Sequence, residues 1–317
     1  MQTDYYSLSC LKRTFRAFLW LGLTGILASC SSEETLDTAN HASVRFELAL
    51  NAESRAARPL NPQAYDTRLY LYERREAEGK VGYTQVDEQQ VTANNLILTD
   101  LIPQKQYKAV FLAVPNGQQP ALPELFRQGT VPTYDQASAT YNNGKTAEST
   151  HEIFRSIVDF KATAASIQQQ AVLSRQNGAL EVRLLNQTGL TKVELHVMGH
   201  TAYYLNDGTG GQVITKGNTC PFVEIVEDPK VLEADVVAIR IHLLPQEDLT
   251  DLSGTNNYLK VTTTVEKTYP IKSDQKFIPI YPNQVTWLTL GSRENTNFDV
   301  SFSGNINLDD PQWDGFQ

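Results

Sequence analysis

The chain has 317 residues, of which 41% are hydrophobic and 20% are charged, and its formal net charge is -9. Residues 1–29 hold three basic residues and one acidic residue, so the rest carries 24 Lys and Arg against 35 Asp and Glu, a net charge of -11. That balance argues against nucleic acid or an anionic membrane surface as the main partner of the chain.

The first 29 residues have the features of a secretory signal. Three basic residues within 12–16 precede an apolar run, 17–26, which is too short for a membrane-spanning helix of about 20 residues. The motif Leu27-Ala28-Ser29-Cys30 follows and resembles a bacterial lipobox, in which the cysteine thiol receives a diacylglyceryl group and becomes the first mature residue. We therefore predict a signal peptide over 1–29 and lipidation (palmitate or a similar acyl chain) at Cys30. An ordinary signal peptide with a chance cysteine is the alternative.

Residues 30–42 are polar and are predicted to form a disordered tether. Ser31 to Glu34 resemble the surface-export tag of Bacteroidota outer-membrane lipoproteins, and a plain solvated tether is the alternative interpretation. The triplet Asp37-Thr38-Ala39 fits the pattern that these bacteria use for O-glycosylation, which makes Thr38 a candidate acceptor.

Cysteine usage limits the chemistry of the folded part. Cys10 and Cys30 lie in the signal region, so only Cys220 remains beyond the tether. An intramolecular disulfide and a metal site built on several thiols are thereby excluded. We expect Cys220 to be a buried small hydrophobic residue.

Alternating apolar residues predict strands throughout the first half. Residues 44–50 alternate with period two, and 105–114 form the strongest strand, which stops at Pro115-Asn116-Gly117. Further strands are expected over 68–72, 81–86, 95–99 and 153–160. Residues 118–150, rich in proline and turn signals, read as a long surface excursion. We interpret it as a tolerated insertion, with a functional loop as the alternative.

The second half continues in the same style. Strands are expected over 179–185, 191–198, 236–244, 258–265, 276–280 and 284–290, with a terminal strand pair over 298–308. A glycine-rich run, 206–211, is predicted to be a loop. No long helical period is present, so the sequence indicates an all-β protein, and its length favours two domains.

The junction between the halves carries a family resemblance. The segment Val172-Leu173-Ser174-Arg175 leads through Gln176-Asn177-Gly178 into an alternating strand. Together with the lipobox, the tether and the C-terminal strands, this pattern resembles the FimB/Mfa2-type fimbrial anchor family, the fimbrillin-like lipoproteins of Bacteroidota. The resemblance implies two tandem transthyretin-like β-sandwich domains, an N-terminal one over 43–168 and a C-terminal one over 169–317.

Candidate catalytic and metal sites are weak. His196 and His200 lie four apart, which on a strand places them on one face about 13 Å apart, so we interpret both as solvent-facing. Asp248, Asp251, Ser253 and Gly254 lack the spacing of a calcium loop and favour an Asx-turn.

Two glycine motifs also fail as nucleotide sites. Gly144-Lys145-Thr146 has Ala139 where a phosphate loop needs its first glycine, and the Gly208-x-Gly210 motif has no third glycine at the required step. We therefore predict no cofactor, no metal, no catalytic residues and no enzymatic activity.

The resemblance implies assembly by strand donation, with the lipid-bearing member holding the fibre at the outer membrane. Residues 44–50 and 298–308 are the candidate segments, and an ordinary internal strand is the preferred interpretation for the first. Cutting after Arg45 or Arg55, as in the maturation of stalk subunits, would release the chain from Cys30.

The sequence thus predicts a fimbrial subunit, lipid-anchored in the outer membrane and surface-exposed, with other fimbrial subunits and membrane lipid as partners and no nucleic acid. The base anchor is the favoured role, and a minor or tip subunit is the alternative. A surface lipoprotein that captures a glycan or another ligand is a second hypothesis, with Tyr203, Tyr204 and Tyr258 as candidate contacts. A secreted hydrolase ranks third.

Overall fold

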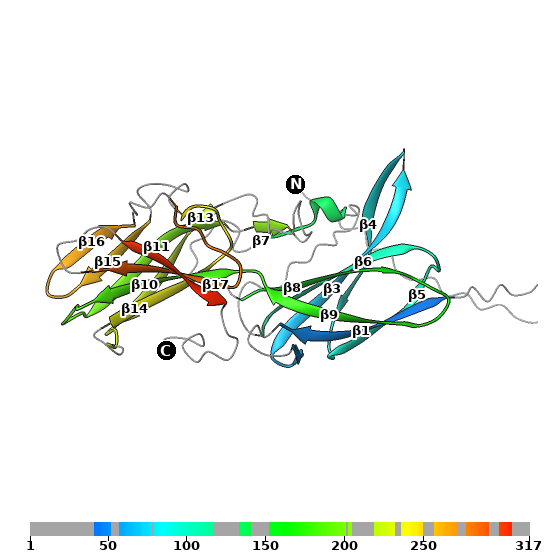
Figure 1. Cartoon of the computed structure of the whole chain (residues 1–317), viewed down its shortest axis with the longest axis horizontal. Helices are drawn as coiled ribbons and strands as arrows, with labels where there is room; N and C mark the ends of the chain where they lie inside the picture. The colour runs from blue at the N-terminus through cyan, green and yellow to red at the C-terminus, as the bar shows by residue number, and fades with distance from the viewer. Residues whose placement is uncertain are drawn as a thin grey trace, which may run out of the picture. The chain divides into compact units, whose positions relative to one another are not determined.

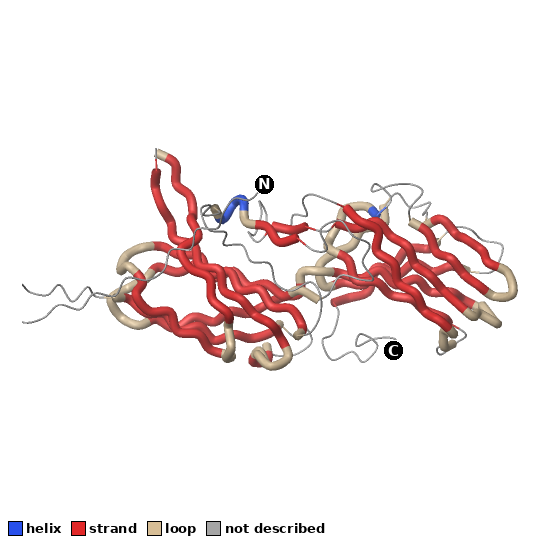
Figure 2. The backbone as a smooth tube through the Cα atoms, turned by 180° about the vertical axis from the view of Figure 1, so that it is seen from behind, coloured by secondary structure: helices blue, strands red, loops and turns tan. Residues whose placement is uncertain are grey.

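The computed structural model describes residues 41–51, 57–77, 79–116, 133–140, 152–200, 202–204, 219–231, 236–249, 257–271, 277–291 and 298–305. Strands dominate this part of the chain, as Figures 1 and 2 show, and the helical element within the described residues is a 3-10 turn, η1 (Tyr134–Gln136). The predicted all-β class is confirmed.

The first half of the chain folds as one eight-stranded sheet that bends into two facing layers. Its strands are β1 (Ala42–Leu50), β2 (Arg58–Pro59), β3 (Tyr65–Ala77), β4 (Lys80–Gln90), β5 (Asn95–Leu101), β6 (Gln106–Pro115), β8 (Phe154–Lys161) and β9 (Ile167–Arg175). Their order is β2-β1-β9-β8-β6-β3-β4, and β5 pairs with β1. Strands β8 and β9 pair through only two residue pairs, Phe154 with Arg175 and Arg155 with Ser174, and there the sheet turns from one layer to the other.

Aromatic side chains fill the space between these layers. Phe46 on β1 meets Phe111 on β6 at 5.1 Å and Phe160 on β8 at 5.5 Å between ring centroids, both edge to face. Rings in this geometry contribute about 0.5–1.5 kcal/mol beyond the burial of their area. The period-two pattern of β1 therefore places its apolar side chains in the core, as its sequence predicts.

The second half forms a two-sheet sandwich. One sheet has the order β14-β10-β17-β18 and the other β13-β11-β15-β16. These strands are β10 (Gly178–Leu185), β11 (Lys192–His200), β13 (Thr219–Glu227), β14 (Val236–Leu243), β15 (Tyr258–Thr262), β16 (Glu266–Pro270), β17 (Gln284–Leu290) and β18 (Asp299–Asn305). Leu180, Val182 and Leu184 face the core between the sheets, as the alternation predicts.

Each half contains one parallel strand pair in an otherwise largely antiparallel arrangement. In the first, β1 runs parallel to β9 from Val44–Ile167 to Leu50–Leu173. In the second, β10 runs parallel to β17. A parallel pair needs a long crossover, so both pairs join strands that are far apart in the sequence.

The described part of the 118–150 excursion contacts both halves. Strand β7 (Ser138–Thr140) pairs antiparallel with β12 (Ala202–Tyr204) of the second half. The ring of Tyr134 in η1 lies 5.3 Å from that of Tyr72 on β3, and both belong to a cluster that also includes Leu244. These contacts tie the excursion to the outer face of the β3–β6 sheet.

Three elements of the second half differ from the sequence prediction. Strand β13 is absent from the sequence prediction, and its position at a sheet edge explains why it accepts Pro221. The segment 258–265 is not one strand, since β15 turns at Thr263 and returns as β16. Residues 277–280 form no extended strand, and Ile280 makes a single bridge to Gln246.

The expected domain boundary between residues 168 and 169 falls inside β9. This strand pairs with β1 up to Leu173, so its residues belong to the sheet of the first half. We propose that the division between the domains follows Arg175 and that β10 begins the second domain.

We predict that Gly178→Ala will destabilise the protein. A Cβ at Gly178 would lie 2.2 Å from the carbonyl oxygen of Tyr281 and 2.9 Å from Cγ2 of Ile280, so the backbone must shift. Overpacking of this kind costs about 1–3 kcal/mol, which urea unfolding will measure. The matched control is Gly82→Ala, where a Cβ meets nothing within 4 Å. Equal midpoints for the two variants would contradict the prediction.

Candidate subunit-contact strands and surface sites

The first strand lies inside its sheet, with a partner on each side. Strand β9 pairs with β1 along one edge, and β5 and β2 pair with it along the other. Its inward side chains, Val44, Phe46, Leu48 and Leu50, are at most 2% exposed. Removal of this strand would open a groove between β5 and β9 and uncover Phe111 and Phe160.

Arg45 lies on the outer face of this paired strand, opposite Ile97 of β5. Its backbone is held in the sheet, so the bond after it is reached by a protease only when the sheet opens locally. Arg55 lies outside the described residues, as do Cys30 and Thr38. The assignments of these four positions stay predictions.

The C-terminal strand pairs within its own sandwich. Strand β18 runs antiparallel to β17, with Val300 opposite Leu288. Phe298, just before it, is 2% exposed and belongs to the core of the second half. Within the described residues β18 pairs with β17 alone, so the other side of β18 is an open edge of this sheet. The second half of the predicted terminal pair, 306–308, lies outside the described residues.

The junction motif is buried and connects the two halves. The Arg175 guanidinium lies 2.6 Å from the carboxylate of Glu152 and 5.4 Å from the ring centroid of Phe154. The Asn177 side-chain oxygen accepts a hydrogen bond from the Ile153 backbone at 3.2 Å, and its carbonyl accepts one from Asn283 at 2.9 Å. The segment that follows Leu173 and Arg175 is therefore fixed by contacts with residues 152–154 of the first half and with Asn283 of the second half.

The outer face of the β10 sheet holds an ionic cluster that the sequence did not predict. Glu181 is 3% exposed and accepts a hydrogen bond from Arg183 at 2.6 Å and another from Arg240 at 2.7 Å. The Arg183 guanidinium also lies 4.1 Å from the ring centroid of Trp287. The alternation of charged with apolar residues in this strand predicts that the charged side chains face solvent. The sequence therefore contains no signal that Glu181 would be buried.

The two histidines lie on the outer face of β11, as the spacing predicts. His196 stacks on Tyr258 at 4.3 Å between ring centroids and lies 3.1 Å from Glu194. Burial raises the pKa of Glu194, but hydrogen bonds from His196 and Lys192 outweigh it and lower this pKa below its ordinary value. Burial lowers the pKa of His200. These contacts form a cross-strand ladder of charges, a structural arrangement.

Other predicted positions have structural partners. Cys220 is 1% exposed, and burial raises the pKa of its thiol, so the expectation of a buried small residue is confirmed. The Asp248 carboxylate accepts a hydrogen bond from the Ile278 backbone at 3.1 Å. Asp251, Ser253, Gly254, the two glycine motifs and the side chains of Tyr203 and Tyr204 lie outside the described residues.

Among the described residues, no three His, Cys, Asp or Glu side chains gather in a way that could hold a metal ion. The same part of the chain has no helix long and apolar enough to cross a membrane.

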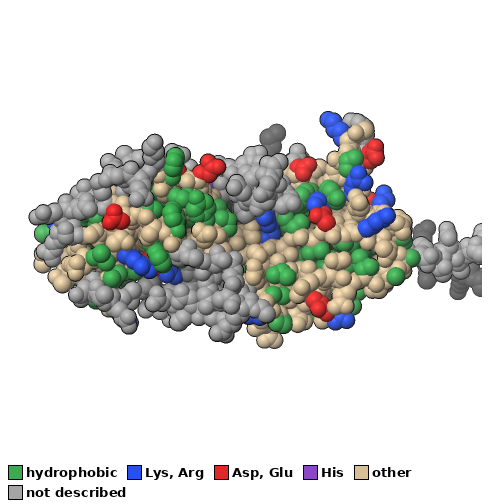
Figure 3. Space-filling view, viewed as in Figure 1, with side chains coloured by type: hydrophobic (Ala, Val, Ile, Leu, Met, Phe, Trp, Pro, Cys, Tyr) green, Lys and Arg blue, Asp and Glu red, His purple; other side chains and the backbone are tan. Residues whose placement is uncertain are grey.

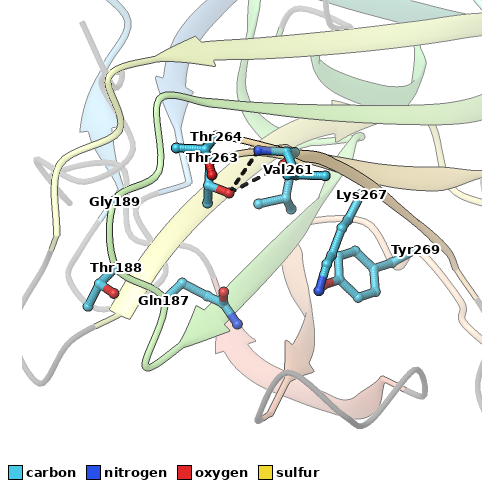
Figure 4. Close-up of a pocket in the computed structure, with 9 residues that line it drawn as sticks. Gln187, Thr188, Gly189, Val261, Thr263, Thr264, Lys267 and Tyr269 are labelled. Carbon is cyan, nitrogen blue, oxygen red and sulfur yellow. Dashed lines mark hydrogen bonds between the residues drawn. The ribbon is translucent and has the colours of Figure 1, made fainter.

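A polar pocket of about 300 Å³ lies beside the turn that connects β15 to β16 (Figure 4). It is lined by Gln187, Thr188, Gly189, Val261, Thr263, Thr264, Val265, Lys267 and Tyr269. Hydroxyl and amide groups supply most of its polar atoms, but the ring of Tyr269 is only 8% exposed. The pocket thus offers hydrogen bonds without an open aromatic surface.

Comparisons with known proteins agree with this architecture. The model of a family described as fimbrillin-A associated anchor proteins Mfa1 and Mfa2 matches residues 34–306. None of the curated proteins matches the sequence.

Solved structures with low sequence identity are also similar. A protein from Bacteroides thetaiotaomicron, described as a "putative adhesin", has a TM-score of 0.51 at 12% identity over 86% of this chain and 100% of its own. The fimbrial anchor protein Mfa2 from Porphyromonas gingivalis has a TM-score of 0.44 at 14% identity, over 84% of this chain and 98% of its own. At 12% identity, the first likeness shows a shared fold.

We predict that Arg175→Leu will destabilise the protein by about 2–4 kcal/mol, since removing one partner of a buried ion pair leaves the other uncompensated. The side chain of Arg175 is 2% exposed and that of Glu152 is 18% exposed. The double variant Arg175→Leu/Glu152→Leu should recover part of the loss in urea unfolding. A single variant as stable as the wild type would show that the pair contributes nothing.

Acid should weaken the fold partly through His200. Because burial lowers its folded-state pKa below 6.5, the unfolded chain takes up this proton first, and stability falls as pH drops below that value. One such group changes the unfolding free energy by at most about 1.4 kcal/mol per pH unit. The slope between pH 7 and 5 should be smaller for His200→Gln than for the wild type. If the pH dependence of the unfolding free energy is the same in both proteins, His200 does not contribute to acid destabilisation.

Proposed function

Since the chain belongs to the family of fimbrillin-A associated anchor proteins Mfa1 and Mfa2, as its sequence resemblance implied, we propose that it is a lipid-anchored fimbrial subunit that attaches the fibre to the outer membrane. The family is one of structural fimbrial proteins, and we propose no enzymatic role for this member. Its partners are then other fimbrial subunits and, through acylated Cys30, the lipid of the membrane.

The observation that carries the anchor role is the place of β1. This strand follows the tether directly, and its side chains form part of the first core. A chain with β1 in place stays covalently joined to Cys30, as an anchor requires. Each methylene of an acyl chain that enters the membrane contributes about 0.8 kcal/mol, so two or three chains hold the protein firmly.

A cut after Arg55 would have the opposite effect. It would detach residues 30–55, and with them both the lipid and β1, as expected of a stalk subunit whose groove then receives a strand from its neighbour. We therefore propose that Arg45 and Arg55 stay uncut in the anchor form. O-glycosylation at Thr38 would lie in the tether, where it leaves the strands unaffected.

Contact with the next subunit is proposed to use an open sheet edge. A strand that adds to an edge gains main-chain hydrogen bonds, while alternate side chains select the partner. Strand β18 offers such an edge in the described part of the second sandwich, and Phe302 on this strand is 46% exposed. A minor or tip subunit would use the same edge, and only the fate of the N-terminus separates it from the anchor.

Ligand capture is the second candidate, and the polar pocket of Figure 4 favours it. A saccharide would suit its hydroxyl and amide groups. Glycan-array binding that is lost in Gln187→Ala, with fimbriae unaltered in a deletion strain, would support capture over anchoring.

We predict that Cys30→Ser will move the protein from the outer-membrane fraction into the soluble fraction and release fimbriae into the medium. Mass spectrometry of the wild-type membrane form should find an acylated N-terminus at residue 30 and residues 30–55 still attached. Arg45→Ala and Arg55→Ala serve as matched controls and should leave attachment unchanged. A mature form that starts at residue 56 would assign the chain to the stalk.

A further inference from the structure

One end of the first sandwich receives the tether. Strand β1 begins at Ala42, opposite Leu101 at the end of β5. The next turns meet there too, because the Gln104 backbone donates to Ala162 at 2.8 Å and Ala162 donates to Lys105 at 3.0 Å. We call this the tether end. If Cys30 is acylated, as proposed above, this is the end of the fold to which the membrane is attached.

A hairpin overhangs the tether end. Strand β3 pairs with β6 only as far as Glu73, opposite Tyr107, but its pairing with β4 continues to Ala77, opposite Lys80. The tip of the β3–β4 hairpin therefore projects beyond the rest of the sheet, as Figure 1 shows. In this overhang, residues 74–77 of β3 pair with 80–83 of β4 and have no partner on β6.

Basic side chains from three separate segments meet beneath the overhang. A groove of about 320 Å³ is lined by Arg74, Arg75, Glu76, Val81, Gln104, Lys105, Gln106 and Lys161. Lys and Arg side chains gather around the hairpin in Figure 3. Four of the lining residues are basic and one is acidic, in a chain whose net charge is -9. The positive charge is thus a local feature.

Neighbouring carboxylates leave part of this charge unpaired. Glu73, only 10% exposed, lies 3.4 Å from Arg75 and 3.9 Å from Lys105. Arg74 and Lys161 are exposed and form no ion pair with any described residue. Asp100, also at this end, lies 3.6 Å from His41. Arg74 and Lys161 are therefore available to an external anion.

Exposed apolar side chains accompany the basic ones. Val81 in the groove is 52% exposed and Ile102 in the turn before β6 is 51% exposed. Surfaces that lie on membranes combine basic residues with apolar ones in this way. An acidic protein partner could also bind the basic side chains of this groove. It would not explain why the groove lies at the end of the fold that is joined to the tether.

We propose that the tether end docks on the anionic phosphate headgroups of the membrane lipid that holds Cys30. Residues 31–41 span at most about 40 Å when extended, so the anchor keeps this end close to the membrane. The attraction is effective within about 8–10 Å at physiological salt, and the covalent anchor supplies the local concentration that free association would lack. Docking fixes the orientation of the first sandwich.

The test attaches the chain to vesicles by chemistry alone, so it does not depend on lipidation in the cell. Chain 30–317 is coupled through Cys30 to a maleimide lipid, while the buried Cys220, 1% exposed, stays unmodified. A membrane-impermeant amine reagent then labels lysines on phosphatidylcholine vesicles with and without 30% phosphatidylglycerol. We expect labelling of Lys80, Lys105 and Lys161 to fall at least threefold with the anionic lipid, and to recover in 0.5 M NaCl.

Two exposed lysines of the second sandwich, Lys230 and Lys267, serve as internal controls and should label equally on both vesicles. The variant Arg74→Gln/Lys161→Gln should lose the protection of Lys80 and Lys105, whereas Lys230→Gln/Lys267→Gln should keep it. Equal labelling of Lys80 and Lys105 on the two kinds of vesicle would overturn the proposal, and so would protection that survives in the first variant. Failure here leaves the Cys30→Ser test of anchoring unaffected.

Discussion

The parallel pairing of β1 with β9 is the constraint on which the rest of this structure depends. It places the first strand after the tether inside the sheet, where Phe46 packs against rings from β6 and β8. Strand β9 then leads through Arg175 and Gly178 into β10, which opens the second sandwich. Strand β9 thus connects β1, through their pairing, to the second half of the chain, which begins with β10.

This arrangement would suit the anchor role proposed above, in which the protein bears load between a membrane and a fibre. A pull on the tether acts at the start of β1, and a pull from the second sandwich acts at the end of β9. Because the two strands are parallel and in register over seven residue pairs, their hydrogen bonds would be loaded together along the strand direction. The Arg175–Glu152 pair and the hydrogen bonds of Asn177 hold the point where β9 leaves the first half.

Charge is distributed unevenly over this acidic chain. On the outer faces of the second sandwich, carboxylates are matched by basic residues on the same or neighbouring strands, such as Glu181 with Arg240 and Glu194 with Lys260. Cross-strand pairs of this kind contribute about 0.2–1 kcal/mol each and leave little net field. The basic groove under the β3–β4 hairpin differs, since its charges come from segments that only the fold brings together. The net charge of the chain argues against attraction of the whole molecule to an anionic surface. It does not reveal the local positive charge at one end of the first half.

The sequence by itself determined the all-β class, the alternation that buries β1 and β10, and the family, because period-two patterns and the lipobox are local signals. It also determined that Cys220 has no cysteine partner in the folded part. Only the tertiary structure decided that β1 lies between β5 and β9, that β18 pairs with β17, and that Glu181 is buried with two arginines. The parallel pairing of β1 with β9 and the contact of Glu181 with Arg240 join strands far apart in the sequence, and even the nearby β17–β18 pairing leaves no local signal. A periodic pattern states which face of a strand is buried without stating what covers it.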